Sequence, residues 1–212
     1  MFGLFKGKKT PPRELTHPKQ LLPGDLLSFK PRSILPPELQ GQTVTIKNVQ
    51  SYQYSEGLAP EFEARLPSGD TFHFMLEEEG DEYLVLSKEI SREQVEQLFD
   101  MDQFAELFGD NFAQLNTHTG NIDEALCAWV APHYTQAIKN ATAYFYKADK
   151  RASGVSDYVE ADDNSEELRY HECEGAPDDF SLNIEIWEDG TTNVFLQKSV
   201  PLNVIEEIWP NG

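Results

Sequence analysis

The stretch FSLNIEIWEDGTTNVFL, residues 180–196, carries the clearest structural signal in the chain. Its first half alternates apolar and polar residues, so one face of an extended strand receives four apolar side chains: Phe180, Leu182, Ile184 and Ile186. Glu188-Asp189-Gly190 has the composition of a tight turn, and residues 192–196 return as a second strand rich in β-formers. The stretch predicts an antiparallel hairpin.

Short strands of the same kind are predicted through the rest of the chain. In the first half they cover residues 26–30, 43–49, 62–66, 71–76 and 82–86, and turn-forming residues such as Pro23-Gly24-Asp25 separate them. In the second half we expect strands at residues 143–147, 158–161 and 168–173. Short strands with regular turns favour a small antiparallel barrel or a curled sheet.

A helical region interrupts the strands. Ser91 and Gln94 have the spacing of a capping box, which predicts a helix start at Ser91. Asp100 interrupts the apolar stripe that follows, so we expect a break there and an end at Gly109. Two further short helices are predicted at residues 122–130 and 202–208.

These patterns predict an α+β protein with two strand-rich antiparallel lobes, the first barrel-like, joined by a helical segment. The expected organisation is a basic, flexible N-terminal arm over residues 1–22 and a barrel-like lobe over residues 23–90. A helical connector then covers residues 91–131, and a second β-rich lobe with the C-terminal hairpin covers residues 132–212.

The charge balance excludes one class of partner. The chain has 212 residues, with 17 Lys and Arg against 37 Asp and Glu, which gives a net charge of −20. Proteins bind phosphate backbones through Lys and Arg, so we expect no nucleic-acid partner. No apolar run approaches the ~20 residues of a membrane span, and the N-terminus lacks a signal peptide. We therefore expect a cytoplasmic protein.

The first 22 residues differ from the rest, because they hold five Lys or Arg residues and one acid. The functional interpretation is that the apolar and basic side chains of this arm contact a membrane surface or a partner. Contact with a membrane would make the protein membrane-peripheral. The residues of this contact would be Phe2, Leu4, Phe5, Lys6, Lys8 and Lys9. The alternative is a terminal tail that makes no such contact.

Candidate residues for chemistry are few. His171 and Cys173 would share one face of a strand, and Asp162 and Asn164 lie in a segment that resembles part of a calcium loop. The paired ligand spacing of zinc sites and the central Gly of an EF-hand are both absent. We therefore expect no metal, no cofactor and no catalytic residue, with these four positions as the weak metal candidates.

Tyrosine and tryptophan residues are a further hint. Tyr52 and Tyr54 alternate with polar residues, and Trp187 lies in the C-terminal hairpin. Such side chains are enriched at recognition surfaces, although they are also common in the cores of β-sheets. The core is the better interpretation for most of them.

Four segments resemble a known family: the N-terminal MFGLFK, residues 22–25, residues 84–87 running into 96–100, and residues 129–134. In this order they look like the bacterial YjfK-like family, a family of unknown function, over nearly the whole chain. Its members tend to be encoded beside PspA-like proteins of bacterial membrane-stress systems. The resemblance implies a protein partner, such as a PspA-like protein, and supplies no catalytic residues.

The leading hypothesis from sequence is a non-enzymatic interaction module in bacterial envelope-stress physiology. The first alternative is a small-molecule or cation-binding domain, which requires a concave pocket lined by aromatic side chains with a few convergent polar groups. The second alternative is an enzyme of unrecognised type. A flat apolar patch would favour the partner, and a deep pocket with crowded carboxylates would favour a ligand or chemistry.

Overall fold

The computed structural model describes residues 13–118, 120, 122–153 and 165–211. Its eleven strands form one sheet: β1 Leu26–Phe29, β2 Thr43–Tyr54, β3 Gly57–Arg65, β4 Thr71–Glu79, β5 Asp81–Ile90, β6 Gln114–Asn116, β7 His133–Tyr146, β8 Glu166–Ala176, β9 Phe180–Trp187, β10 Thr192–Pro201 and β11 Ile205–Trp209. The helices are short: η1 Pro18–Gln20, η2 Pro37–Leu39, α1 Arg92–Leu98, α2 Met101–Glu106, α3 Glu124–Cys127 and η3 Leu202–Val204.

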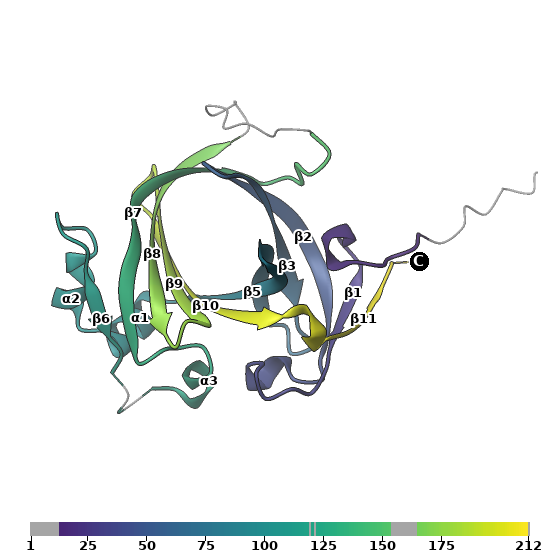
Figure 1. The fold of residues 1–212 in the computed structure, drawn as a ribbon, viewed down its shortest axis with the longest axis horizontal. Helices are drawn as coiled ribbons and strands as arrows, with labels where there is room; N and C mark the ends of the chain where they lie inside the picture. Colours follow the sequence, from purple (N-terminus) through teal and green to yellow (C-terminus); the bar gives the residue numbers. More distant parts are fainter. Residues whose placement is uncertain (1–12, 119, 121, 154–164, 212) are drawn as a thin grey trace, which may run out of the picture.

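The sheet closes on itself. Its strand order is β11-β1-β2-β3-β4-β5-β10-β9-β8-β7-β6, and β2 also pairs with β7. This additional pairing joins Ser51 to Tyr146 and Gln53 to Tyr144 in antiparallel register. The strands from β2 to β7 therefore form a closed ring of eight, which curls round an open centre in Figure 1. β1 and β11 extend the sheet beyond β2, and β6 extends it beyond β7.

The outward face of the ring packs into the main hydrophobic core. On the side of β1, the rings of Phe29 and Phe72 lie 6.2 Å apart, and Phe62 stacks on Phe74 at 4.9 Å. On the side of the helices, the ring of Phe99 meets that of Tyr134 edge-on at 6.0 Å. Figure 1 shows α1, α2 and β6 outside β7 and β8. The alternating apolar residues of the strands are thus covered from outside, and the opposite face lines the centre of the ring.

The predicted strand-rich antiparallel character is confirmed, but the protein is mostly β rather than α+β. The expected two lobes do not separate, because β5 pairs with β10 and β2 pairs with β7. Strands that precede and follow the helical segment therefore belong to one sheet. Alternation in a sequence predicts that a strand forms, but it does not say which edge the strand will pair with.

Predictions from local sequence patterns were accurate where the hydrogen-bond partners lie close together in the sequence. The hairpin of β9 and β10 forms as predicted, with Ile186 opposite Thr192. Ser91 caps α1 in a capping box with Gln94. The predicted break is also confirmed, because α1 ends at Leu98 and Asp100 caps the start of α2.

The predicted helix over residues 202–208 is wrong. Only Leu202–Val204 form a 3₁₀ turn, and β11 then pairs with β1. The free edge of β1 supplies hydrogen-bond partners that an isolated helical pattern cannot anticipate.

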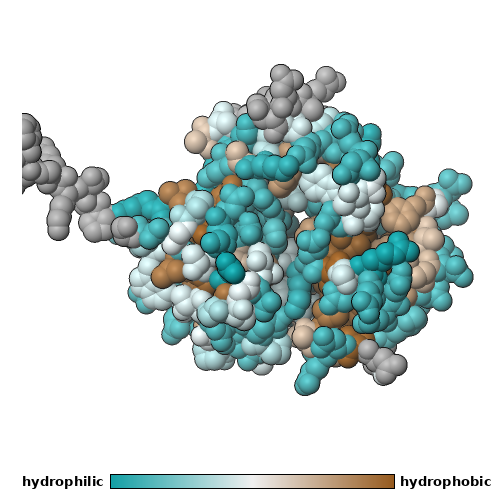
Figure 2. All heavy atoms as spheres, turned by 180° about the vertical axis from the view of Figure 1, so that it is seen from behind, coloured by the Kyte–Doolittle hydropathy of each residue, from teal (hydrophilic) through white to brown (hydrophobic). Residues whose placement is uncertain are grey.

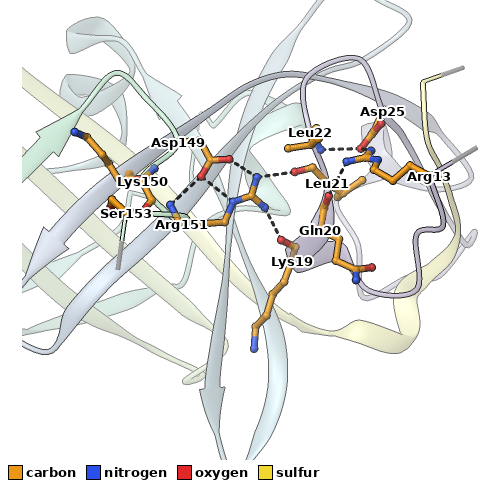
Figure 3. Close-up of polar contacts among 11 residues, drawn as sticks. Arg13, Lys19, Gln20, Leu21, Leu22, Asp25, Asp149, Lys150, Arg151 and Ser153 are labelled. Atoms are coloured by element: carbon orange, nitrogen blue, oxygen red, sulfur yellow. Dashed lines mark hydrogen bonds and ion pairs between the residues drawn. The ribbon is translucent and has the colours of Figure 1, made fainter. Parts of the chain in front are cut away.

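Polar contacts hold the described N-terminal segment against the ring (Figure 3), and a further one reaches Asn211 near the C-terminal end of the described residues. Asp25, 1% exposed, accepts hydrogen bonds from the backbone N–H groups of Leu22 at 2.7 Å and Asn211 at 2.8 Å, and it pairs with Arg13. Gly24 makes this turn with a φ of 94°, and a Cβ there would lie 2.4 Å from Asn211 Nδ2. The turn therefore requires glycine.

Arg151 makes a second tie, from the loop after β7. Its guanidinium donates to the carbonyls of Lys19 and Leu21, and Asp149 holds it in place through hydrogen bonds at its Nε and Nη2 (Figure 3). The same group lies 5.3 Å from the ring centre of Phe62, so it links η1 to the sheet.

Figure 2 shows the side of the molecule opposite to that in Figure 1. This side is mostly hydrophilic, and its hydrophobic residues form small areas. Within the described residues, no helix has the length and apolar character needed to cross a membrane.

We predict that Asp25→Ala lowers the free energy of unfolding by about 2–4 kcal/mol, because the buried carboxylate accepts two partly buried backbone N–H groups and pairs with Arg13, and all three lose this acceptor. Urea denaturation followed by circular dichroism measures this change. The matched control is Asp110→Ala at an exposed position, which should change stability by less than about 0.5 kcal/mol. A loss for Asp25→Ala no larger than that of the control would contradict the assignment.

Candidate functional site

Around Glu185, the inner face of the ring is polar and aromatic rather than aliphatic. On each strand, the residues that alternate with the outward-facing core positions point to the centre of the ring. On β9, Glu185 lies between Ile184 and Ile186 and therefore points to the centre. The same alternation brings Glu61 of β3 and His73 of β4 to the inner face. Together they line a cavity of about 490 Å³, which we name the Glu185 cavity.

Glu185 is the most unusual residue of this cavity. It is 3% exposed, and its carboxyl group accepts two long hydrogen bonds: from Tyr52 Oη at 3.4 Å and from Asn183 Nδ2 at 3.3 Å. Burial raises its pKa to about 8, and the nearby Glu61 adds to this rise. None of the ion pairs among the described residues involves Glu185.

Glu61 is also buried, at 5% exposed, but it is well partnered. His73 Nδ1 lies 2.8 Å from Glu61 Oε2, and the side-chain amide of Gln50 donates to the same oxygen. Although burial lowers the pKa of His73, the hydrogen bond and charge of Glu61 outweigh it and raise that pKa overall. The Glu61–His73 pair is therefore satisfied within the protein, whereas Glu185 forms no ion pair with any residue that the structure describes.

Aromatic rings form much of the remaining wall. Phe145 packs against Tyr52 at 5.0 Å and meets Trp187 edge-on at 5.4 Å, and Phe195 lies 6.2 Å from the His73 ring. Trp187 Nε1 is buried and has no acceptor among the described residues, so the part of its indole that faces the cavity is carbon. These rings place π-electron density beside the two buried carboxyl groups.

More acidic side chains lie at the rim of the Glu185 cavity. They are Glu166, Glu167, Glu188 and Asp189. Among the described lining residues, the basic ones are His73 and Lys147, and Lys147 forms an ion pair with Glu166. The negative potential of this opening attracts cations and repels anions.

A second cavity, of about 730 Å³, lies toward the other end of the ring. We name it the Glu172 cavity. Its walls include Tyr54, Tyr170 and Met75, together with several carboxylates. Burial raises the pKa of Glu172, and Glu77 and Glu174 raise it further.

The predicted metal candidates do not gather into a site in the described part of the chain. His171 and Cys173 lie on β8 and are both buried, and His171 Nδ1 lies 3.0 Å from Gln136 Nε2. Phe108 also packs edge-on against His171 at 5.1 Å. Among the described residues, no group of three or more His, Cys, Asp or Glu side chains is arranged to hold a metal ion.

Several other predictions fall outside the described residues. Asp162 and Asn164 of the proposed calcium segment lie there, as does the predicted strand at residues 158–161. The same holds for the N-terminal residues of the expected membrane or partner contact: Phe2, Leu4, Phe5, Lys6, Lys8 and Lys9.

The sequence reading missed Glu61, His73 and Glu185 as functional candidates. Each occupies a polar position on an alternating strand, and such a position is ordinarily solvent-facing. The signal that could have identified them is aromatic residues at polar-facing positions of the neighbouring strands. Tyr52 and Tyr54 alternate in this way on β2, and Trp187 does so on β9, the strand of Glu185. Only closure of the ring turns that face inward.

Comparison with protein-family models, with curated proteins and with solved structures finds no match to this chain. The resemblance to the YjfK-like family, and the envelope-stress role and PspA-like partner that it implies, therefore stay predictions.

The raised pKa of Glu185 predicts a specific pH dependence of stability. The folded protein holds this proton up to about pH 8, whereas an unfolded chain releases it near pH 4.5. Unfolding between these values releases a proton, so raising the pH destabilises the wild type. We compare the unfolding free energy of the wild type with that of Glu185→Gln, which has no titrating group at this position. The difference, wild type minus variant, should fall by up to about 1.4 kcal/mol per pH unit from pH 5 to pH 8.

Chemical denaturation at several pH values measures this difference. The matched control is Glu106→Gln, an exposed carboxylate on α2 outside the Glu185 cavity, which should leave the pH dependence of the wild type unchanged. Parallel curves for Glu185→Gln and wild type would show that Glu185 titrates normally.

Proposed function

We propose that the ring is a binding site for a small organic cation and that the cation occupies the Glu185 cavity. The observation that carries this proposal is the burial of Glu185 with two long, neutral hydrogen-bond partners. A carboxylate in such a place is costly unless a positive charge compensates it. A bound cation would supply that charge, and the proton that Glu185 holds in the free protein would leave.

The rest of the cavity supports the sign of the ligand. Glu61 and the acidic rim add negative potential, and Lys147 of the lining is already paired with Glu166. A cation would be drawn toward this opening and an anion would be repelled. The net charge of −20 acts in the same direction over longer distances.

The aromatic walls support an organic cation over a metal ion. Ammonium and guanidinium groups interact favourably with the faces of Tyr and Trp, by about 0.5–2 kcal/mol for each contact. The cavity volume of about 490 Å³ lies in the range of pockets for small organic molecules. A metal ion would instead require several converging oxygen or nitrogen ligands.

This proposal takes up the ligand-binding alternative of the sequence analysis. There, a deep pocket with crowded carboxylates was expected to favour a ligand or chemistry. The Glu185 cavity is such a pocket. Binding alone accounts for the arrangement, so no catalytic step is included in the proposal.

Choline and its neutral isostere 3,3-dimethylbutan-1-ol test the proposal, because they share shape and differ in charge. In isothermal titration calorimetry at about pH 8, we expect choline to bind at least about tenfold more tightly than the isostere. Glu185→Gln should weaken choline binding at least about tenfold, because the amide carries no charge to match the ammonium group.

Glu106→Gln, at an exposed position on α2, is the matched control and should bind choline like the wild type. A thermal melt of each variant confirms that it is folded. Equal binding of the two ligands, no detectable binding of choline, or an unchanged affinity in Glu185→Gln would each overturn the proposal.

A further inference from the structure

The two cavities lie in succession along the inside of the ring, and we name the pair of them the passage. On β2, Tyr52 lines the Glu185 cavity and Tyr54 lines the Glu172 cavity. His73 and Met75 divide in the same way on β4, as do Glu185 and Asn183 on β9. Residues two apart on a strand share a face and advance about 6.8 Å along it. The cavities therefore follow each other along the axis of the ring.

The Glu172 cavity is acidic along its length. Six carboxylates line it: Glu56, Glu77, Glu78, Glu172, Glu174 and Asp178. No Lys or Arg is among the described residues that line it. Glu172 is half-buried within this group, so its charge is poorly solvated and would be compensated by a cation in the cavity.

Contacts at the boundary join the two carboxyl groups. Asn183 lines the Glu172 cavity, donates to Glu185 at 3.3 Å and lies opposite Glu172 in the pairing of β8 with β9. Glu172 and Glu185 are therefore diagonal neighbours on adjacent strands. With a 6.8 Å advance along the strand and 4.8 Å between strands, their Cα atoms lie roughly 8 Å apart.

Aromatic rings line the wall between these charges. Tyr52 and Tyr54 stack with their ring centres 5.7 Å apart and their planes at 9°, and Tyr54 meets Tyr170 edge-on at 5.4 Å. The carbon atoms of these rings extend the aromatic wall from one cavity to the next. It suits a chain of methylene groups better than a second compact charged group.

We propose that the cation is a linear aliphatic polyamine that lies along the passage, with one ammonium group at Glu185, another at Glu172 and its methylene chain on Tyr52 and Tyr54. This inference rests on the proposed function, because it takes the cation site at Glu185 as given. It adds the length of the ligand and the number of its charges. A ligand with a single charged group would leave Glu172 uncompensated.

Spermidine and butylamine test the polyamine, since both carry primary ammonium groups on a four-carbon chain and differ in charge and length. Calorimetry at about pH 8 in ~150 mM salt screens attraction to the acidic surface. We expect one spermidine per chain, bound at least about tenfold more tightly than butylamine. Glu172→Gln should weaken spermidine binding several-fold and leave choline binding unchanged, whereas Glu185→Gln should weaken both.

The outcomes separate the two proposals. If choline binds as expected but Glu172→Gln binds spermidine like the wild type, the polyamine is wrong and the cation site at Glu185 stands. If neither choline nor spermidine binds, both proposals fail. If several spermidine molecules bind per chain and Glu106→Gln loses as much affinity as Glu172→Gln, the attraction belongs to the acidic surface and the polyamine proposal is overturned.

Discussion

The pairing of β2 with β7 is the interaction on which the rest of the structure depends. It involves only residues 51–53 and 144–146, but it converts an open sheet into a ring of eight strands. Before closure, the face that carries Glu61, His73 and Glu185 would be an ordinary solvated face of an antiparallel sheet. After closure, the same side chains are enclosed, and their charges lose much of their hydration.

Enclosing carboxyl groups lowers the stability of the fold relative to a well-packed apolar lining of the same volume. Replacing buried charges by hydrophobic residues is often neutral or stabilising, whereas a buried carboxyl group without a cation has a raised pKa. At Glu185, hydrogen bonds do little to offset the cost of burial, because Tyr52 and Asn183 donate only long ones. The covering of the outer face by β1, β11 and the helices supplies the hydrophobic core that tolerates it. We interpret the lining as an arrangement that a bound cation completes.

Sequence patterns predicted the parts of this fold that depend on near neighbours. The hairpin of β9 and β10, the cap at Ser91 and the break between two helices at Asp100 depend on local sequence, and these predictions are confirmed. The strand edges that pair β5 with β10 and β1 with β11 lie far apart in the chain, so the continuous sheet and β11 were missed. The site was missed for the same reason. The alternation of Glu185 with Ile184 and Ile186 gives the face of the strand, but only closure at Ser51 and Tyr146 decides whether that face meets water.

The protonation state of Glu185 with and without a bound cation tests the central claim most directly. Carbon-13 NMR of the side-chain carboxyl, assigned by its loss in Glu185→Gln, would follow it through a pH titration. The account predicts a pKa of about 8 in the free protein and an ionised carboxylate at pH 7 once spermidine or choline is bound. A carboxyl group that titrates near its ordinary value in the free protein, or one that stays protonated at pH 7 in the presence of saturating cation, would contradict it.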